Sequence, residues 1–184
     1  DVKAAIAGAA KKVEAVYNYP YQNHATMEPM NATALYTADK CEVWCGTQNG
    51  EAAFAATLEA SGLPAEKCDV HKVMPGGGFG RRGQTDYVRQ AVVIAKQMPG
   101  TPIKLLWSRE EDMAHGRYHP ITQCKMTGAF DANNNLVALH YRLSGQSILF
   151  SLRPEALQNG MDPAAFQGVA QSGEAAFGYS VPNL

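Results

Sequence analysis

The sequence has few cysteines, almost no net charge and no long apolar run. Four cysteines in 184 residues are far too few for a scaffold held together by disulfides. A net charge of -1 gives no electrostatic footprint for nucleic acid or for an anionic membrane. The apolar runs are only a few residues long, whereas a membrane-spanning helix needs about 20. We therefore expect one or at most two small domains, with no nucleic-acid partner and no membrane span.

Targeting features are also missing. The chain begins at Asp1 without methionine and shows no charged segment followed by an apolar one, so no signal peptide is visible. It stops at Leu184, after a short run of polar and apolar residues. We expect this chain to be a fragment or a domain of a longer protein.

The cysteine pattern does not indicate a metal centre. No Cys-x-x-Cys pair occurs, so an iron–sulfur cluster within this chain is not expected. Cys41 and Cys45 would point to one face of a strand about 13 Å apart, too far to share a metal directly. Buried free thiols are the favoured interpretation for these two and for Cys68 and Cys124, while disulfide pairing stays open.

Two polar groups have both a functional and a structural interpretation. Glu111, His115 and His119 recur at intervals of four, as metal ligands on one helix do. A glycine and a proline interrupt that helix, which favours capping, turn or surface roles. His24 and Glu28 could work as an acid–base pair, but a capped turn in a packed loop is favoured.

The hydrophobic pattern predicts an α+β fold: a mixed β-sheet with antiparallel hairpins and packed helices. The strands alternate apolar and polar residues, which favours this fold over a doubly wound parallel sheet. The expected helices lie at about 2–11, 52–61, 85–100 and 109–114. The expected strands lie at about 12–19, 32–37, 41–45, 68–74, 103–107, 121–130 and 136–144. The pair at 32–37 and 41–45 is expected to form a hairpin, and residues 131–135 a turn between the last two strands. We assign residues 1–146 to one domain, and residues 147–184 to an irregular or helical segment completed by further chain.

Some positions carry more specific expectations. Gly62 and Thr85 are the expected C-cap of the second helix and N-cap of the third. The third helix has one apolar face, made of Val88, Ala91, Val92 and Ala95. Trp44 and Trp107 are expected in the core, the latter on a short buried strand.

The most unusual segment is the glycine loop, Pro75–Gly83, between a predicted strand and a predicted helix. Three consecutive glycines admit positive φ and let another group approach the main chain. Successive backbone N–H groups in such a loop can form an anion-binding nest, and Arg81 and Arg82 place two permanent cations beside it. The loop therefore predicts a site for a phosphorylated or anionic cofactor. The alternative is a flexible turn with solvated arginines.

Residues 78–83 also match the Gly-x-Gly-x-x-Gly pattern of nicotinamide dinucleotide sites. The preceding strand carries polar residues, whereas that fold needs a buried parallel strand. The acidic residue expected about 20 positions later lies further on, at Glu110 or Glu111. The nicotinamide interpretation is therefore the weaker one.

Several motifs in a consistent order resemble those of a known family. The motifs are His24–Thr33, Cys41–Gln48, Gly76–Arg82, Trp107–Met113, Arg117–Pro120 and Tyr179–Asn183. They resemble the molybdenum hydroxylases, the xanthine dehydrogenase and aldehyde oxidase family, and within it large (beta) subunits of the isoquinoline 1-oxidoreductase type. The resemblance runs over nearly the whole chain, and the ordered set is more specific than any single motif. It implies part of a molybdenum-cofactor-binding domain.

The resemblance implies a molybdenum–pterin cofactor, which in bacteria is usually the molybdopterin cytosine dinucleotide. Gln48 then takes the role of the glutamine whose amide approaches the metal's oxo ligand, and no residue of this chain binds the metal directly. The cofactor-binding residues that the resemblance implies are Gln48, Gly77, Gly78, Phe79, Gly80, Arg81 and Arg82. Taken alone, Gln48 is better interpreted as a residue of a first helical turn.

The resemblance also carries departures that bear on activity. Xanthine-type members have a glutamate where Gly83 stands, which favours an isoquinoline-like N-heterocycle or an aldehyde as the substrate, oxidised with water as the oxygen source. The family's general-base glutamate lies far downstream, so we expect no catalytic residue here, and an isolated fragment that is inactive and without cofactor.

The family also implies partners and an origin. The implied partners are the rest of the large subunit, an iron–sulfur small subunit and a small-molecule substrate. The resemblance points to a bacterial protein and leaves the periplasm and the cytoplasm open. The remaining alternative is a non-catalytic binding domain that keeps this fold.

Overall fold

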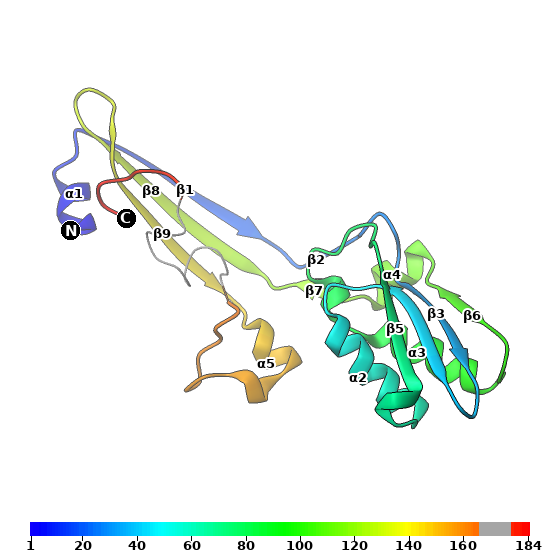
Figure 1. Cartoon of the computed structure of the whole chain (residues 1–184). Coiled ribbons are helices and arrows are strands. Elements are labelled where there is room, and N and C mark those ends of the chain that lie inside the picture. Colours follow the sequence, from blue (N-terminus) through cyan, green and yellow to red (C-terminus); the bar gives the residue numbers. More distant parts are fainter. Residues whose placement is uncertain (166–177) are drawn as a thin grey trace. The chain divides into compact units, whose positions relative to one another are not determined.

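The computed structural model describes residues 1–165 and 178–184, with the elements labelled in Figure 1. The chain divides into two compact units. The central unit is Asn23–Tyr118, and the terminal unit joins Asp1–Gln22 to His119–Leu184. These units do not follow the predicted division at residue 146. Completion of residues 147–184 by further chain stays a prediction.

The chain passes between the two units at two short strands. These are β2 (Gln22–Asn23) and β7 (Tyr118–His119). His119 therefore lies on a strand and not on the helix that carries Glu111 and His115.

The central unit is built on a four-stranded mixed sheet. Its strands are β3 (Asn31–Tyr36), β4 (Cys41–Gly46), β5 (Cys68–Val73) and β6 (Ile103–Leu106). They lie in the order β5-β4-β3-β6, in which β3 is antiparallel to β4 and β6, and β4 is parallel to β5. The helices are α2 (Gly50–Ser61), α3 (Asp86–Lys96) and α4 (Arg109–His115), with 3-10 turns at Ala65–Lys67 and Arg81–Gly83. This arrangement confirms the predicted α+β class and the β3–β4 hairpin.

Helices α2 and α3 contact each other and cover the same face of the central sheet (Figure 1). Asn49 caps α2 by accepting a hydrogen bond from a first-turn N–H, and Gly62 ends the helix with φ +73°, as predicted. The predicted apolar face of α3 is fully buried, at Val88, Ala91, Val92 and Ala95. Thr85 precedes α3, but its side chain makes no capping hydrogen bond. The helix ends at Lys96, short of the predicted end at Gly100.

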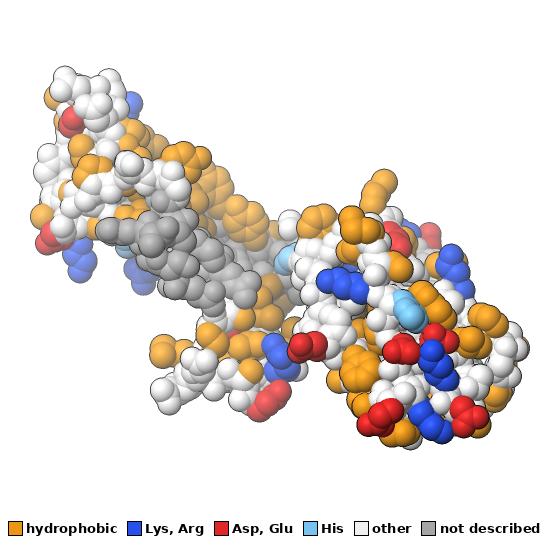
Figure 2. Space-filling view, in the orientation of Figure 1, with side chains coloured by type: hydrophobic (Ala, Val, Ile, Leu, Met, Phe, Trp, Pro, Cys, Tyr) orange, Lys and Arg blue, Asp and Glu red, His pale blue; other side chains and the backbone are white. Residues whose placement is uncertain are grey.

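The outer face of the central sheet is more polar than its inner face. Trp44 lies on this side and stacks on His71 with the ring centroids 4.8 Å apart, so its assignment to the core is wrong. Trp107 is buried as expected, but the strand before it, β6, alternates in exposure and lies at the sheet edge. Side chains of both charges are interspersed over the visible face of this unit in Figure 2. Lys40, for example, forms an ion pair with Glu42 at 3.0 Å.

All four cysteines are buried free thiols, as the spacing predicts. Burial raises the pKa of the Cys41 and Cys45 thiols to about 11. Both thiols are therefore protonated and unreactive near neutral pH, which suits a packing role.

The terminal unit contains a three-stranded antiparallel sheet in the order β1-β8-β9. The strands are β1 (Lys11–Tyr19), β8 (Thr122–Phe130) and β9 (Leu136–Gly145). The predicted turn at 131–135 is closed by the Asp131 carboxylate, which accepts hydrogen bonds from the N–H groups of Asn133 and Asn135 at 2.8 and 2.9 Å. The unit also contains helices α1 (Val2–Ala7) and α5 (Ile148–Leu152) and a 3-10 turn at Pro154–Ala156. The predicted helix over 2–11 is thus too long, because the chain leaves the helix at Gly8 and enters β1 at Lys11.

The end of the chain pairs with the edge of this sheet. Leu139 N–H donates to the Asn183 carbonyl at 2.9 Å, and Asn183 Nδ2 donates to the Val137 carbonyl at 3.1 Å. Residues 166–177 of the predicted 147–184 segment lie outside the described residues. None of the described helices has both the length and the apolar character needed to cross a membrane.

Candidate cofactor site

The glycine loop, Pro75–Gly83, connects β5 to α3 in the central unit. Because β4 and β5 are parallel, they end at the same side of the sheet, so the loop starts close to where β4 ends and α2 begins. Gly77 and Gly80 have φ values of +99° and +101°, which glycine adopts readily. Phe79 has φ +54°, a strained conformation for a bulky residue, and its side chain is 68% exposed. The loop therefore presents an aromatic ring beside glycines that have no side chains.

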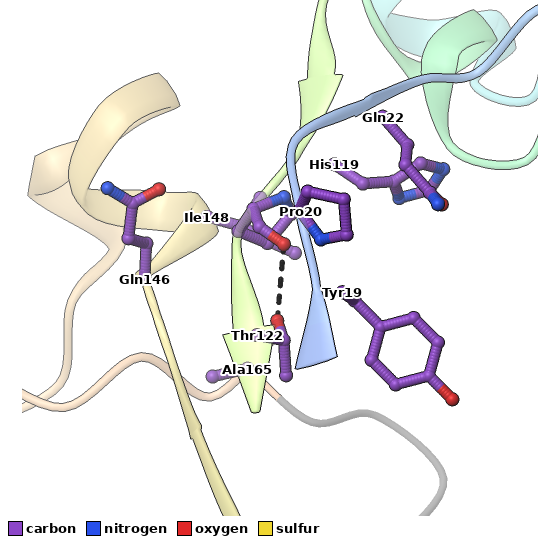
Figure 3. Close-up of a pocket in the computed structure, with 9 residues that line it drawn as sticks. Tyr19, Pro20, Gln22, His119, Thr122, Gln146, Ile148 and Ala165 are labelled. Carbon is purple, nitrogen blue, oxygen red and sulfur yellow. Dashed lines mark hydrogen bonds between the residues drawn. The ribbon is translucent and has the colours of Figure 1, made fainter. Parts of the chain in front are cut away.

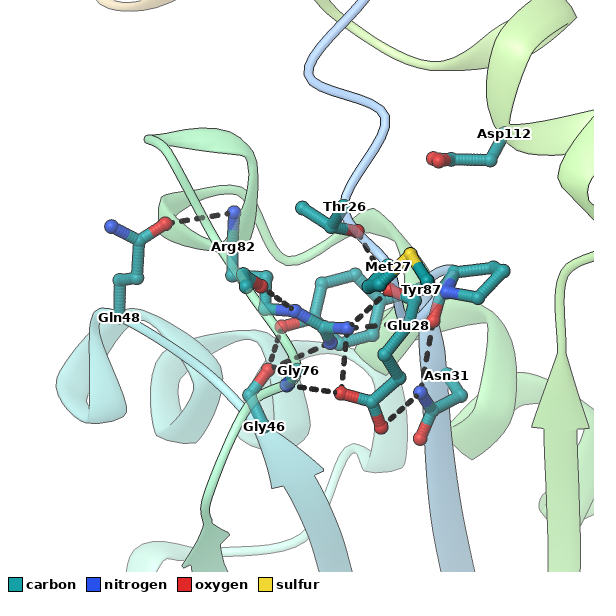
Figure 4. A network of polar contacts seen from close by, with 12 residues as sticks. Thr26, Met27, Glu28, Asn31, Gly46, Gln48, Gly76, Arg82, Tyr87 and Asp112 are labelled. Carbon is teal, nitrogen blue, oxygen red and sulfur yellow. Dashed lines mark hydrogen bonds and ion pairs between the residues drawn. The ribbon is translucent and has the colours of Figure 1, made fainter.

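Gln48 fixes the C-terminal half of the loop. Its Oε1 accepts hydrogen bonds from Gly80 N–H at 3.0 Å and from Arg82 N–H at 3.2 Å. The main-chain N–H of Gln48 donates to the Arg82 carbonyl at 3.0 Å. A Cβ on Gly78 would lie 2.4 Å from Gln48 Oε1, so glycine is required for this approach. The amide oxygen is therefore committed to the loop, and the amide nitrogen points away from it (Figure 4).

The Arg82 side chain is fully buried and crosses beneath the loop. Its Nε donates to the Gly77 carbonyl at 2.7 Å, and Nη1 donates to the Gly46 carbonyl at the end of β4 at 3.2 Å. Its Nη2 donates to the Glu28 carbonyl at 2.7 Å and to Glu28 Oε2 at 2.9 Å. Tyr87 OH also donates to the Gly46 carbonyl, at 2.8 Å. Arg82 thus joins three chain segments (Figure 4).

Glu28 fixes the N-terminal half of the loop. Gly76 N–H donates to Glu28 Oε2 at 2.6 Å, and Glu28 N–H donates to the Gly76 carbonyl at 3.1 Å. Asn31 Nδ2 donates to Glu28 Oε1 at 2.8 Å. Burial raises the pKa of Glu28, but the hydrogen bonds from Gly76 and Asn31 and the charges of Arg82 and Lys104 outweigh it and leave the pKa lowered. Glu28 is therefore a carboxylate at neutral pH.

The segment that carries Glu28 is held from its other side by α4. Arg109 Nη2 donates to the Thr26 carbonyl and, at 3.3 Å, to the Met27 carbonyl. Arg109 Nη1 donates to the buried Asp112 carboxylate at 2.9 Å. Thr26 is buried, whereas the Met27 side chain is 91% exposed. Clamping the backbone in this way leaves the Met27 side chain pointing outward next to Glu28.

Arg81 is also internal. It makes a bidentate ion pair with Asp86, both contacts at 2.8 Å, and its guanidinium lies 5.4 Å from the centre of the Trp107 ring. Its side chain is 1% exposed, and within the described residues its Nε has no hydrogen-bond partner. The prediction of two cations available to an anion beside the loop is therefore wrong for the side chains of Arg81 and Arg82. Both arginines hold the protein together because their partners lie inside it.

The site offers hydrogen-bond donors and apolar contacts but no metal-binding cluster. In residues 1–165 and 178–184, no group of three His, Cys, Asp or Glu residues could hold a metal ion. Glu111 and His115 form a pair on α4 at 3.2 Å, while His24 Nδ1 lies 3.0 Å from the Arg117 carbonyl.

The structure brings the predicted site residues together but changes their roles. Gln48, the glycines and Phe79 are contiguous at the surface, whereas both arginines support them from within. The role of Glu28 as an anchor was missed, because its partners Gly76 and Arg82 lie 48 and 54 positions away. The signal for Glu28 was its place in the first motif, His24–Thr33.

A separate cavity of about 400 Å³ lies in the terminal unit (Figure 3). Its lining includes Tyr19, Gln22, His119, Gln146 and Ile148. None of the predicted cofactor-binding residues lines it. Of the residues named here only His119 lies in one of the ordered motifs, Arg117–Pro120, and that motif does not indicate a cavity.

The comparisons with known proteins place these features in a family. Residues 1–161 match the family described as molybdopterin cofactor-binding domain. Membrane-bound aldehyde dehydrogenase (pyrroloquinoline-quinone) of Gluconacetobacter polyoxogenes is 26% identical over 82% of this chain and 19% of the relative. Isoquinoline 1-oxidoreductase subunit beta of Brevundimonas diminuta is 32% identical over 71% of this chain and 17% of the relative. The solved aldehyde oxidoreductase from Desulfovibrio gigas matches with a TM-score of 0.61 at 19% identity, over 79% of this chain and 16% of that one.

These matches confirm the resemblance carried by the ordered motifs. The structural likeness shows the shared fold, and the family match covers most of the chain. The chain spans about a fifth of the length of these two curated relatives. It therefore belongs to the molybdopterin cofactor-binding domain family, within the molybdenum hydroxylases of the xanthine dehydrogenase and aldehyde oxidase type.

Proposed function

We propose that this chain forms part of the cofactor-binding region of a molybdenum hydroxylase large subunit. The reaction would be the oxidation of an N-heterocycle or an aldehyde, with water as the oxygen source. The observation that carries the proposal is the orientation of Gln48: its amide oxygen is bound to the loop, so its amide nitrogen is the group presented outward. An amide N–H suits an oxo group because it donates a hydrogen bond without competing as a metal ligand.

The residues present fit a molybdenum–pterin group. Gly78 has no room for a side chain beside Gln48, so the main chain and the Gln48 amide lie together where a flat ligand could contact both. Phe79 offers an exposed ring that would exclude water from such a ligand once it is bound. When bound, the group supplies two-electron oxidation chemistry. The residues that would hold it are Gln48, Gly77, Gly78, Phe79 and Gly80, and the cytosine dinucleotide form is part of the proposal.

The proposed substrate class is supported by Gly83. A Cβ at this position would meet nothing within 4 Å, and the residue presents no carboxylate. This fits an isoquinoline-like heterocycle or an aldehyde better than a purine held by a glutamate at that place. The general-base glutamate, the rest of the large subunit and an iron–sulfur small subunit remain predicted contributions from outside this chain. Matches to bacterial relatives support a bacterial origin, with periplasm and cytoplasm both open.

Two alternatives remain distinct from this proposal. A non-catalytic binding domain would keep the fold without loading a cofactor. The structure supports the nicotinamide alternative less well, because β5 is an exposed edge strand and the glycine loop ends in the 3-10 turn Arg81–Gly83 before α3 begins.

The test is the cofactor content of the intact protein. We would express the complete large subunit with its small partner and measure molybdenum and oxidised-pterin fluorescence per chain. The proposal predicts about one of each in the wild type, and a clear loss of both in Gln48→Ala and Phe79→Ala. Neither metal nor pterin, in a host that loads a control enzyme, would leave the non-catalytic domain as the better account. The name of the Gluconacetobacter polyoxogenes relative gives a different cofactor, pyrroloquinoline quinone. The same assay separates the two, because that quinone contains no molybdenum.

A further inference from the structure

We propose that Glu28 and Arg82 are positioning residues, whose ion pair holds the glycine loop in its ligand-ready conformation before any cofactor binds. The identity of the ligand rests on the proposed function, but the positioning itself does not. The pair joins the segment around Glu28, the end of β4 at Gly46 and the start of the loop at Gly76 and Gly77. These segments are far apart in the sequence, so nothing local would bring them together.

The first contact is a two-point pairing at the start of the loop. Gly76 donates to the Glu28 carboxylate at 2.6 Å and accepts from the Glu28 N–H at 3.1 Å. A Cβ on Gly76 would lie 2.5 Å from Glu28 Cβ. The two backbones are therefore as close as a glycine allows, and the carboxylate fixes where the loop begins.

The second contact runs beneath the loop. Arg82 Nε binds the Gly77 carbonyl at 2.7 Å, and Nη2 reaches Glu28 Oε2 at 2.9 Å. The Arg82 main chain is at the same time held by Gln48, through hydrogen bonds at its N–H and its carbonyl. Arg82 therefore connects the Glu28 anchor at one end of the loop with the Gln48 anchor at the other. The Glu28 carboxylate supplies the counter-charge that a fully buried guanidinium requires.

The residue that depends on both anchors is Phe79. It holds φ +54° between Gly77 and Gly80, which are themselves at positive φ. A free run of glycines samples many conformations, and a bulky residue rarely adopts this one without constraint. Removing the ion pair should therefore release residues 76–80 while the buried sheet beneath them stays folded.

The experiment measures backbone amide hydrogen exchange over residues 74–84 in the complete subunit with its partner, prepared from a host that cannot synthesise pterin. Glu28→Ala removes every side-chain contact, and Glu28→Gln keeps the size and an acceptor oxygen but removes the charge. Glu66→Gln is the matched control, because Glu66 is exposed and lies in the same unit away from the loop. We expect exchange in the loop to accelerate by about tenfold or more in Glu28→Ala, by less in Glu28→Gln and not at all in Glu66→Gln.

A pH series separates positioning from a general packing role. The charged groups facing Glu28 are the cationic side chains of Arg82 and Lys104. Because the pKa of Glu28 is lowered, the Glu28–Arg82 ion pair should persist below the usual carboxyl range. It should be lost as the pH falls through that lowered pKa. Loop exchange, corrected for its chemical pH dependence, should follow this titration in the wild type and lose it in Glu28→Gln.

The outcomes distinguish this inference from the proposed function. Loop exchange that is unchanged in Glu28→Ala overturns the positioning role, whether or not the wild-type protein from a competent host holds pterin. A loop released by Glu28→Ala supports the positioning role, even if the wild type from a competent host holds neither molybdenum nor pterin. In that second case only the proposed function would fail.

Discussion

The central and terminal units differ in which parts of their structure the long-range side-chain hydrogen bonds hold. In the central unit, Gln48 and Glu28 reach the glycine loop across 32 and 48 positions of sequence. In the terminal unit, Asp131 closes a turn within four positions, and the long-range bond from Thr127 to Glu14, across 113 positions, joins two paired strands and not a loop. Long-range bonds to a loop cost more chain entropy than local ones, and they fix the loop relative to the whole unit. That is the arrangement a preformed ligand site needs.

The two sheets differ in the same sense. Strands β3 and β4 alternate buried and half-buried residues against α2 and α3. Strand β1 is exposed along nearly its whole length, with Val13, Val16 and Tyr17 among its exposed apolar side chains. Hydrophobic side chains follow the terminal sheet in Figure 2. The packed sheet gives the glycine loop a rigid base, whereas β1 is held mainly by its pairing with β8.

The largest expected effect comes from breaking the buried pair. Arg82→Met keeps the approximate length of the side chain but leaves Glu28 without its counter-charge and several carbonyls without the Arg82 donors. We expect a loss of about 3–5 kcal/mol in the free energy of unfolding, measured by urea denaturation. The control is Arg89→Met, which breaks an exposed pair with Glu59 and should cost about 1 kcal/mol or less. Equal effects of the two substitutions would contradict the account.

A smaller effect tests the fit between the loop and Gln48. In Gly78→Ala the new Cβ would lie 2.4 Å from Gln48 Oε1, so the hydrogen bonds to Gly80 and Arg82 must break or shift. We expect a destabilisation of about 1–3 kcal/mol by thermal or chemical unfolding. Gly83→Ala is the matched substitution, because its Cβ would meet nothing within 4 Å, and it should be neutral. A stable Gly78→Ala protein would mean that Gln48 is not held as described.

Phe79→Gly should separate stability from binding. Glycine adopts the +54° φ of this position readily, and the ring it removes is mostly exposed. Relief of strain should therefore offset the lost contacts, leaving the free energy of unfolding within about 1 kcal/mol of the wild type. Cofactor content, measured on the same preparation, should fall. A large loss of stability would show that the Phe79 ring is a packing residue.

The smallest effect lies in the terminal unit, at Glu14 on β1. A hydrogen bond from Thr127, and then Lys125, lower the pKa of this exposed carboxyl. A lowered folded pKa gives a contribution to stability that is present above the unfolded pKa and is lost as the pH falls through the folded one. An NMR titration should show that Thr127→Val and Lys125→Gln each raise the pKa of Glu14. An unchanged pKa in either variant would contradict the corresponding contact.

Much of the fold followed from local patterns. The apolar face of α3, the C-cap of α2 at Gly62 and the turn at 131–135 are fixed by residues close together in the sequence, and they were predicted. The end of α1 and the exposure of β6 and Trp44 were not, because they depend on what packs against each element. Local propensity carries no information about that packing.

The site shows the same limit. The glycine loop and Gln48 were found through motifs, but the directions of the Arg81 and Arg82 side chains were not. An arginine next to a glycine loop can pair with a bound anion if it faces outward, or with a carboxylate of the protein if it faces inward. Only the positions of Asp86 and of Glu28, the latter 54 residues away from Arg82, decide that both point inward. Long-range partners of this kind cannot be read from spacing.

The most direct test of the central claim is the molybdenum and pterin content of three forms of the complete subunit: wild type, Gly78→Ala and Gly83→Ala. Our account predicts about one of each per chain in the wild type and in Gly83→Ala. It predicts a strong loss in Gly78→Ala, because only that substitution displaces the Gln48 amide from the loop. Equal loading of all three proteins would contradict the claim that this loop and Gln48 hold the cofactor.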